Sequence, residues 1–323
     1  MPYYPGEQQS PQNNPPPKGQ PVLRRVLLCL SALLIAYGAC RLIGYGIDWL
    51  SSGLTSWELR EIAAASEFSP EPETSASPVP FPAPAALPTA DPAGIPAAAP
   101  ASPSPVLSEE LPAVRYPTGL QVSPRIRKLR KKSEYIVGWI TVDTLDEPVV
   151  QKDNTFFLNH DAAGKRNVNG AIFMDEDTLL VTRPYTILLY GHNMKTGAMF
   201  GNLKKYDQLS YFNRHRIIRF DTLYEDGQYA VFAVATIRLT PGTAAYLNLA
   251  DLTSTRRKTR QKALNTLTAL SAHTAVLDVN EEDQLLLLVT CVGDDDQRLI
   301  VAARRLREKE TPDTLTLKKR SVP

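Results

Sequence analysis

Apolar and polar positions divide the chain into one long apolar segment near the N-terminus and a C-terminal part rich in short apolar runs. Val26 to Cys40 is unbroken apolar or small, and Arg41 is the first charge to follow it, with Asp48 next. A helix over residues 26–40 reaches about 22 Å, short of the roughly 30 Å hydrocarbon core, whereas residues 26–47 reach about 33 Å. With Arg41 near one interface, the pattern predicts a transmembrane anchor at residues 26–50.

A cleaved signal peptide is the alternative interpretation of this segment. Residues 36–38 (Ala-Tyr-Gly) loosely resemble a small-x-small cleavage site, and residues 37–40 (Tyr-Gly-Ala-Cys) faintly resemble a lipoprotein box. An uncleaved anchor is favoured, because apolar residues continue past Arg41 and because Tyr45 and Trp49 suit an aromatic belt at the far interface. The basic residues before Val26 predict that the N-terminus lies inside and that the rest of the chain is extracellular.

From Thr118 onward, short apolar runs bounded by polar and turn residues predict a mainly β domain. The expected strands are Ile136–Val142, Pro148–Gln151, Ala171–Met174, Thr186–Tyr190, Arg216–Phe220, Tyr229–Leu239, Gln284–Cys291 and Arg298–Leu306. Helical periodicity is present at Leu120–Lys132, Ala198–Tyr206 and Ser254–Ser271. Long connections between several strands favour a closed, partly irregular barrel with inserted helices over a simple meander.

Composition adds the boundaries between these parts. Of the 27 prolines, seven precede Val22, fourteen lie at residues 70–117 and six are in the remainder. We therefore expect a disordered cytoplasmic tail at 1–25, a Pro/Ala/Ser-rich extracytoplasmic linker at 51–117, a globular domain at 118–310 and a C-terminal tail at 311–323. A formal charge of +2 gives no field that would favour a nucleic-acid partner, and three cysteines exclude a disulfide framework.

A thiol and a guanidinium flank one predicted turn. LLLLVTC is followed by VGDDDQ and then RLIVAARRL, so antiparallel pairing would place Cys291 near Arg298 at the rim of the barrel. A nearby cation favours the thiolate and can hold a developing oxyanion. The alternative is a buried, inert cysteine beside a solvated arginine. Arg304 and Arg305 are rival arginines, but they lie further from the turn.

The turn itself carries Asp294, Asp295 and Asp296, whose carboxylates would work against a thiolate unless they point to solvent. A solvated turn is favoured over a cation site. We expect no metal or cofactor, because no CxxC or HExxH motif is present.

A histidine follows another predicted strand. TILLY ends at Gly191, and His192 occupies the exit loop, where a rigid strand end leaves a side chain exposed. An imidazole there can act as general acid or base. The alternative for a lone loop histidine is a solvated or hydrogen-bonded side chain, and this interpretation is preferred for His160, His215 and His273.

Five segments in a fixed order resemble a known family: DNTFFLNHD, NGAIFMDE, LLYGHNMKTGAMFGNL and LLLVTC with a downstream RLIVAARRL. Together they resemble class B sortases, the cysteine transpeptidases of Gram-positive bacteria, from about Arg127 to about Arg307. The resemblance implies an eight-stranded sortase barrel and a catalytic triad of His192, Cys291 and Arg298.

The resemblance also implies an activity and partners. Cys291 would attack the Thr carbonyl of a C-terminal sorting motif on a secreted protein, His192 would protonate the leaving amine, and Arg298 would bind the oxyanion. A peptidoglycan cross-bridge amine or a pilin lysine would then resolve the thioacyl enzyme. The short loop at 292–297 departs from the family pattern and leaves the substrate contacts of that loop open.

Two other functions are weighed against this one. A papain-like or cell-wall cysteine peptidase also needs Cys and His, but His192 precedes Cys291 here and the cysteine ends a late strand. A catalytically inactive, tethered surface or adhesion domain on the same barrel predicts the loss of a triad residue, and all three are present. The basic run at residues 125–132 is interpreted as a solvated helix face, with attraction to anionic wall polymers or lipids as the alternative.

Overall fold

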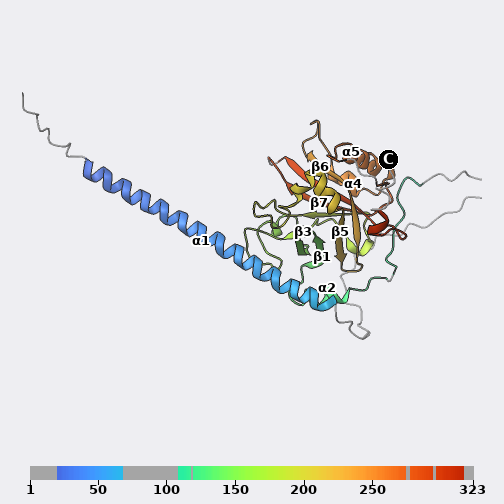
Figure 1. Ribbon diagram of the computed structural model, residues 1–323, viewed down its shortest axis with the longest axis horizontal. Coiled ribbons are helices and arrows are strands. Elements are labelled where there is room, and N and C mark those ends of the chain that lie inside the picture. Colours follow the sequence, from blue (N-terminus) through green and yellow to red (C-terminus); the bar gives the residue numbers. More distant parts are fainter. Residues whose placement is uncertain (1–19, 68–107, 118, 274–276, 294–295, 316–323) are drawn as a thin grey trace, which may run out of the picture. The chain divides into compact units, whose positions relative to one another are not determined.

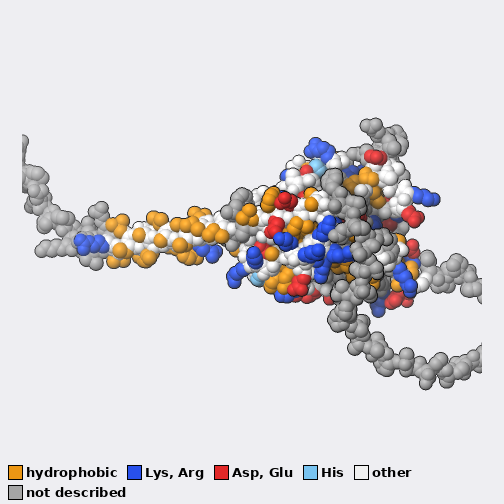
Figure 2. Space-filling view, turned by 90° about the horizontal axis from the view of Figure 1, so that it is seen from below, with side chains coloured by type: hydrophobic (Ala, Val, Ile, Leu, Met, Phe, Trp, Pro, Cys, Tyr) orange, Lys and Arg blue, Asp and Glu red, His pale blue; other side chains and the backbone are white. Residues whose placement is uncertain are grey.

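The computed structural model describes residues 20–67, 108–117, 119–273, 277–293 and 296–315. The chain forms two compact units, residues 1–50 and residues 51–323, and helix α1 (Gln20–Glu67) contributes to both. Among the described residues, Arg25–Gly44 is the one stretch long and apolar enough to cross a membrane, with a mean hydropathy of 2.2. The apolar side chains within Arg25–Gly44 are exposed, as Figure 2 shows for this part of the helix. A membrane anchor and a signal segment both fit this helix.

The second unit is built on a closed barrel of eight strands (Figure 1). The strands are β1 (Ile136–Val142), β2 (Leu145–Val150), β3 (Ile172–Met174), β4 (Thr186–Tyr190), β5 (Ile217–Thr222), β6 (Gln228–Arg238), β7 (Leu285–Cys291) and β8 (Gln297–Arg305). Their order around the barrel is β1-β2-β3-β4-β7-β8-β6-β5, and β5 pairs with β1 to close it. The β2–β3 and β4–β7 pairs are parallel, and the other pairs are antiparallel. The predicted barrel and its eight strands are confirmed.

Strand β7 explains why an apolar run without alternation still forms a strand. Leu286 and Leu288 belong to the core inside the barrel, whereas Leu285, Leu287 and Val289 belong to a second core on the other face. Helices α4 (Leu249–Thr253) and α5 (Arg257–Ala269) cover that second core. Because both faces of β7 are buried, both sets of alternating positions are apolar.

The helices follow the predictions less closely than the strands. Helix α2 (Pro124–Arg130) and α5 are shorter than the predicted helices that contain them. The expected helix at Ala198–Tyr206 is wrong: the chain there makes turns and then a 3-10 helix, η3 (Leu203–Asp207). Met199 has φ +50°, in the left-handed region that ends an α-helix. The short helices α3 (Leu209–Arg214), η1 (Phe156–Leu158) and η2 (Leu180–Thr182), together with α4, were not predicted.

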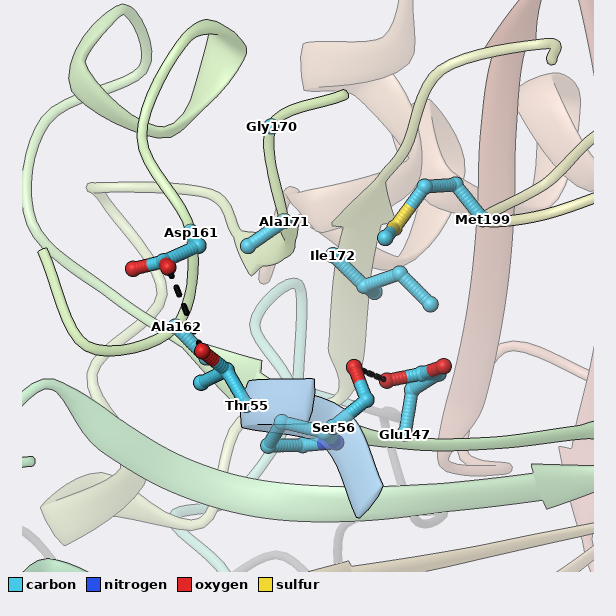
Figure 3. Close-up of a pocket in the computed structure, with 10 residues that line it drawn as sticks. Thr55, Ser56, Glu147, Asp161, Ala162, Gly170, Ala171, Ile172 and Met199 are labelled. Carbon is cyan, nitrogen blue, oxygen red and sulfur yellow. Dashed lines mark hydrogen bonds between the residues drawn. The ribbon is translucent and has the colours of Figure 1, made fainter. Parts of the chain in front are cut away.

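The stretch after residue 50 differs from the expected linker. Residues 51–67 continue α1, and Leu59 and Ala63, four residues apart on one helix face, are buried in the barrel unit. Ser56 donates to Glu147 at 2.8 Å, and Thr55 donates to Asp161 at 3.4 Å (Figure 3). Residues 51–67 contain no proline and several Leu, Ala and Glu residues, which favour helix. The segment is therefore helical and differs from the expected extended linker.

The folded domain also begins earlier than residue 118. Leu111 and Tyr116 are buried, and Glu110 pairs with Arg256 in an isolated β-bridge. The expected disordered tail also ends earlier than residue 25, since α1 begins at Gln20. Residues 1–19 and most of the predicted linker (68–107) lie outside the described residues, as do residues 316–323 of the predicted C-terminal tail.

Candidate active site

Cys291 lies at the rim of the barrel, at the last residue of β7. The six residues before it in the strand are buried, whereas Cys291 is exposed. In the β7–β8 ladder its direct partner is Arg298, which is half-buried. Directly opposite residues in an antiparallel pair place their side chains on the same face of the sheet. The predicted placement of Cys291 opposite Arg298 across this turn is therefore present in the structure.

His192 reaches the same rim through the parallel pair β4–β7. Tyr190, the last residue of β4, is in register with Val289, and the Gly191 amide donates to the Val289 carbonyl at 3.3 Å. His192 lies two residues after Tyr190, and Cys291 lies two residues after Val289. The register of the ladder thus brings the histidine loop to the end of the cysteine strand.

The imidazole of His192 is held by the loop after η1. Its Nε2 lies 2.7 Å from the carbonyl oxygen of Leu158. A carbonyl can only accept, so Nε2 carries a proton and donates in this bond. Gly170 packs against the ring, since a Cβ there would lie 3.1 Å from Cδ2 of His192. With Nε2 occupied, Nδ1 is the nitrogen left to exchange a proton.

Asn193 completes the rim and was not singled out in the sequence analysis. Its side-chain Nδ2 donates to the main-chain carbonyl of Cys291 at 2.9 Å. This bond ties the residue next to His192 directly to the proposed nucleophile. Its place beside His192 in the motif was the available signal, but an asparagine in a loop has many other uses.

Tyr190 borders the site from β4. Its hydroxyl donates to Asp175 at 3.2 Å, and burial, assisted by the Asp175 charge, raises the pKa of Tyr190 well above its ordinary value. The charge of Arg298 acts on Tyr190 in the opposite direction. Tyr190 therefore stays a neutral phenol at physiological pH.

The rival arginines are used at the other end of β8. Arg304 is fully buried and pairs with Glu310 at 2.6 Å, and Arg305 pairs with Glu225 at 3.2 Å. In the ladder they lie opposite or just beyond Leu285, the first residue of β7, a strand length away from Cys291. The preference for Arg298 is consistent with this geometry.

Asp296, the turn aspartate that the structure describes, bonds to residues at and just after the end of β6. Asp296 accepts from Thr240 at 2.6 Å and from Arg238 at 3.2 Å. The Thr240 hydroxyl and then Arg238 hold the pKa of this carboxyl below its usual range. Asp294 and Asp295 lie outside the described residues. Within the described part of the chain, no group of three or more His, Cys, Asp or Glu side chains could hold a metal ion.

The other predicted candidates make structural contacts. His160 stacks on Phe156, His215 stacks on Tyr211, and Nε2 of His273 lies 2.9 Å from a main-chain carbonyl. In the basic run, the ion pairs and carbonyl bonds include Arg125 with Asp221, Lys132 with Glu58, and Arg130 with the Ile136 carbonyl. Much of this run thus pins α2 to its neighbours.

Two curated proteins are similar to this chain over part of its length. Sortase B of Staphylococcus aureus is 36% identical over 115 residues, which are 35% of this chain and 47% of that protein. Sortase B of Listeria monocytogenes is 32% identical over 117 residues, 35% of this chain and 48% of that protein. The match thus spans about half the length of these curated relatives.

Solved structures extend the likeness to about 60% of this chain. The crystal structure of sortase B from Bacillus anthracis has a TM-score of 0.52 and 29% identity, over 61% of this chain and 90% of that one. A Staphylococcus aureus sortase B–substrate complex has a TM-score of 0.51 and 26% identity, over 58% and 88%. The family model of the sortase domain matches residues 140–306, more than half of the chain, and the chain belongs to the sortase family.

Proposed function

We propose that this chain is a membrane-anchored cysteine transpeptidase that cleaves a sorting motif in secreted proteins and joins them to an amine. The observation that carries the proposal is the rim where β7 presents the exposed thiol of Cys291 directly opposite Arg298. The loop that carries His192 is bonded to the main-chain carbonyl of Cys291 at the same rim. Membership of the sortase family supports it. The proposal assigns the roles of nucleophile, acid–base and oxyanion donor to Cys291, His192 and Arg298.

The first half-reaction forms a thioester. The Sγ thiolate of Cys291 attacks the carbonyl carbon of the motif's Thr, and the electron pair of the C=O bond moves onto oxygen. The Arg298 guanidinium donates hydrogen bonds to this oxyanion. As the intermediate collapses, the C–N bond breaks, and the leaving amine takes a proton from Nδ1 of His192. The C-terminal remainder of the motif departs.

The second half-reaction forms an amide. His192, now neutral at Nδ1, takes a proton from the acceptor amine as its nitrogen attacks the thioester carbon. Collapse of the second intermediate breaks the C–S bond and returns the Cys291 thiolate. One amide bond is broken and one is formed, so the thioester conserves the bond energy and the reaction needs no ATP, metal or cofactor.

Substrates and location follow from the same proposal. The acyl donor is a secreted protein with a C-terminal sorting motif, and the acceptor is a peptidoglycan cross-bridge amine or a pilin lysine. The helix at Arg25–Gly44 holds the chain in the cell membrane as a single span with its N-terminus inside. The barrel unit then lies outside the cell, where both substrates are found.

The test is mass spectrometry of the full chain in detergent with a library of sorting-motif peptides and amine acceptors. A variant with Cys29→Ser and Cys40→Ser leaves Cys291 as the single thiol. The expected result is a thioacyl adduct on Cys291 that converts to an amide product and is absent from Cys291→Ala. Product acid without amide would favour the cysteine peptidase. No adduct, with a thiol still open to alkylation, would favour the inactive surface domain.

A further inference from the structure

The seam between β4 and β7 is continued by side chains after its backbone ladder stops. Within the strands, Thr186 to Tyr190 pair in parallel register with Leu285 to Val289. The last backbone bond is the one from the Gly191 amide to the Val289 carbonyl, 3.3 Å. In a parallel ladder every second residue bonds to the neighbouring strand, so the next donor from the β4 side is residue 193, and its acceptor is the carbonyl of residue 291.

At that position the side chain of Asn193 takes the place of the backbone. The exit loop leaves the ladder after Gly191, and Nδ2 of Asn193 donates to the Cys291 carbonyl at 2.9 Å. A second side chain bridges the same gap, because the hydroxyl of buried Thr290 donates to the Gly191 carbonyl at 2.7 Å. Two side-chain bonds thus hold the two segments of the chain together at the rim of the barrel, where His192 and Cys291 lie.

The far side of the loop is also anchored. The Phe200 amide donates to the His192 carbonyl at 3.0 Å, and Asn193 forms an isolated antiparallel bridge with Met199. The loop is therefore a small hairpin. The side-chain amide of Asn193 joins this hairpin to the main-chain carbonyl of Cys291.

We propose that Asn193 is a positioning residue that fixes the His192 hairpin against Cys291 and so sets the distance between imidazole and thiol. The inference rests on the proposed function for its catalytic meaning. Asn193 touches no reacting atom, and it acts through the main chain of both reacting residues. Proton transfer requires hydrogen-bond distance, and a misplacement of about 1 Å can lower a rate by about a hundred-fold.

Three variants separate this role from simple loop stability. Asn193→Asp keeps the shape but replaces the donor by an acceptor that faces the Cys291 carbonyl, so the hairpin loses its tie. The matched control is Asn202→Asp, because the side-chain amide of Asn202 donates to the Thr144 hydroxyl at 3.1 Å, in the turn between β1 and β2. Thr290→Val removes the second bond at nearly constant volume and tests the seam independently should Asn193→Asp fail to fold.

The first measurement needs no peptide. In full-length protein with Cys29→Ser and Cys40→Ser, the alkylation rate of Cys291 by iodoacetamide is followed against pH by intact mass, with His192→Ala as the reference for an uncoupled thiol. We expect Asn193→Asp and the charge-neutral Thr290→Val to shift the profile toward that of His192→Ala, while Asn202→Asp keeps the unmodified profile. An Asn193→Asp profile that coincides with the unmodified one overturns the proposal.

The second measurement is steady-state transpeptidation with a peptide that the mass-spectrometry test identifies as a substrate. Loss of a positioning bond lowers kcat about ten-fold and leaves KM within about two-fold, because substrate binding is unchanged. An equal fall for Asn202→Asp would assign the effect to loop stability and refute the positioning role. If no variant turns over any peptide but the alkylation profiles still separate, the positioning role stands and the proposed transpeptidation fails.

Discussion

Docking of residues 51–67 on the barrel makes a quantitative prediction about stability. Leu59 is 3% exposed and packs in the barrel core, whereas Leu54, on the same helix, is 59% exposed. Leu59→Ala removes a buried side chain and leaves a cavity, which costs about 2–5 kcal/mol. Because the segment is near one end of the unit and can relax, we expect about 2–3 kcal/mol, a shift of about 1 M in the urea midpoint.

The assay is urea unfolding of the full chain in detergent, followed by the fluorescence of Trp139, which is 1% exposed. Replacing Trp49 and Trp57 by Phe removes the other two indoles. Leu54→Ala is the matched control. Its free energy of unfolding should lie within about 0.5 kcal/mol of that of the unmodified chain, since leucine and alanine both favour helix and the side chain is exposed. If Leu59→Ala destabilises the barrel no more than Leu54→Ala, the helix is not docked, and the reasoning is refuted.

The same packing decides where a soluble fragment should begin. A fragment that starts at Thr118 lacks the buried side chains of Leu59, Ala63, Leu111 and Tyr116. Their removal uncovers apolar surface on the barrel, so we expect this fragment to be less stable and more prone to aggregation than one that starts at Ser51. Equal urea midpoints for the two fragments would show that residues 51–117 add nothing to the core.

Three further predictions concern buried or strained positions. Gly170→Ala should destabilise the domain by about 1–3 kcal/mol and lower transpeptidation, because φ is +63° and an added Cβ would clash with the Phe157 carbonyl. Thermal unfolding and turnover measure the two effects. Arg304 holds the pKa of Glu310 at about 2, so the stability from this pair is complete above the ordinary pKa near 4.5 and is lost as the pH falls toward 2. Glu310→Gln should therefore flatten the dependence of the unfolding free energy on pH between these two values. An unchanged pH dependence would contradict this. Arg260→Met should cost about 2–4 kcal/mol in urea unfolding, because the fully buried guanidinium is the donor for several main-chain carbonyls, and a cost below about 1 kcal/mol would contradict that role.

Local sequence predicted the strands well and the helices less well. A strand such as β7 is indicated by its own residues, because LLLLVTC is apolar on both faces and too short for a core helix. At residues 198–206 the apolar spacing fits a helix, but backbone conformations such as that of Met199 end it, and apolar spacing carries no record of them. The helix at 51–67 was overlooked because its two buried residues, Leu59 and Ala63, are too few to stand out.

What the sequence alone determined is the chemistry available: an apolar N-terminal segment, eight strand-forming runs, and the motifs that carry His192, Cys291 and Arg298. These follow from neighbouring residues, because periodicity, turn chemistry and residue type are local properties. The local β7–β8 turn already places Cys291 opposite Arg298, but tertiary structure alone decided that His192 shares their rim, because β4 and β7 are a parallel pair of strands far apart in the chain. The bond from Asn193 to the Cys291 carbonyl has the same origin: only barrel closure brings a loop amide to a main-chain group almost a hundred residues away.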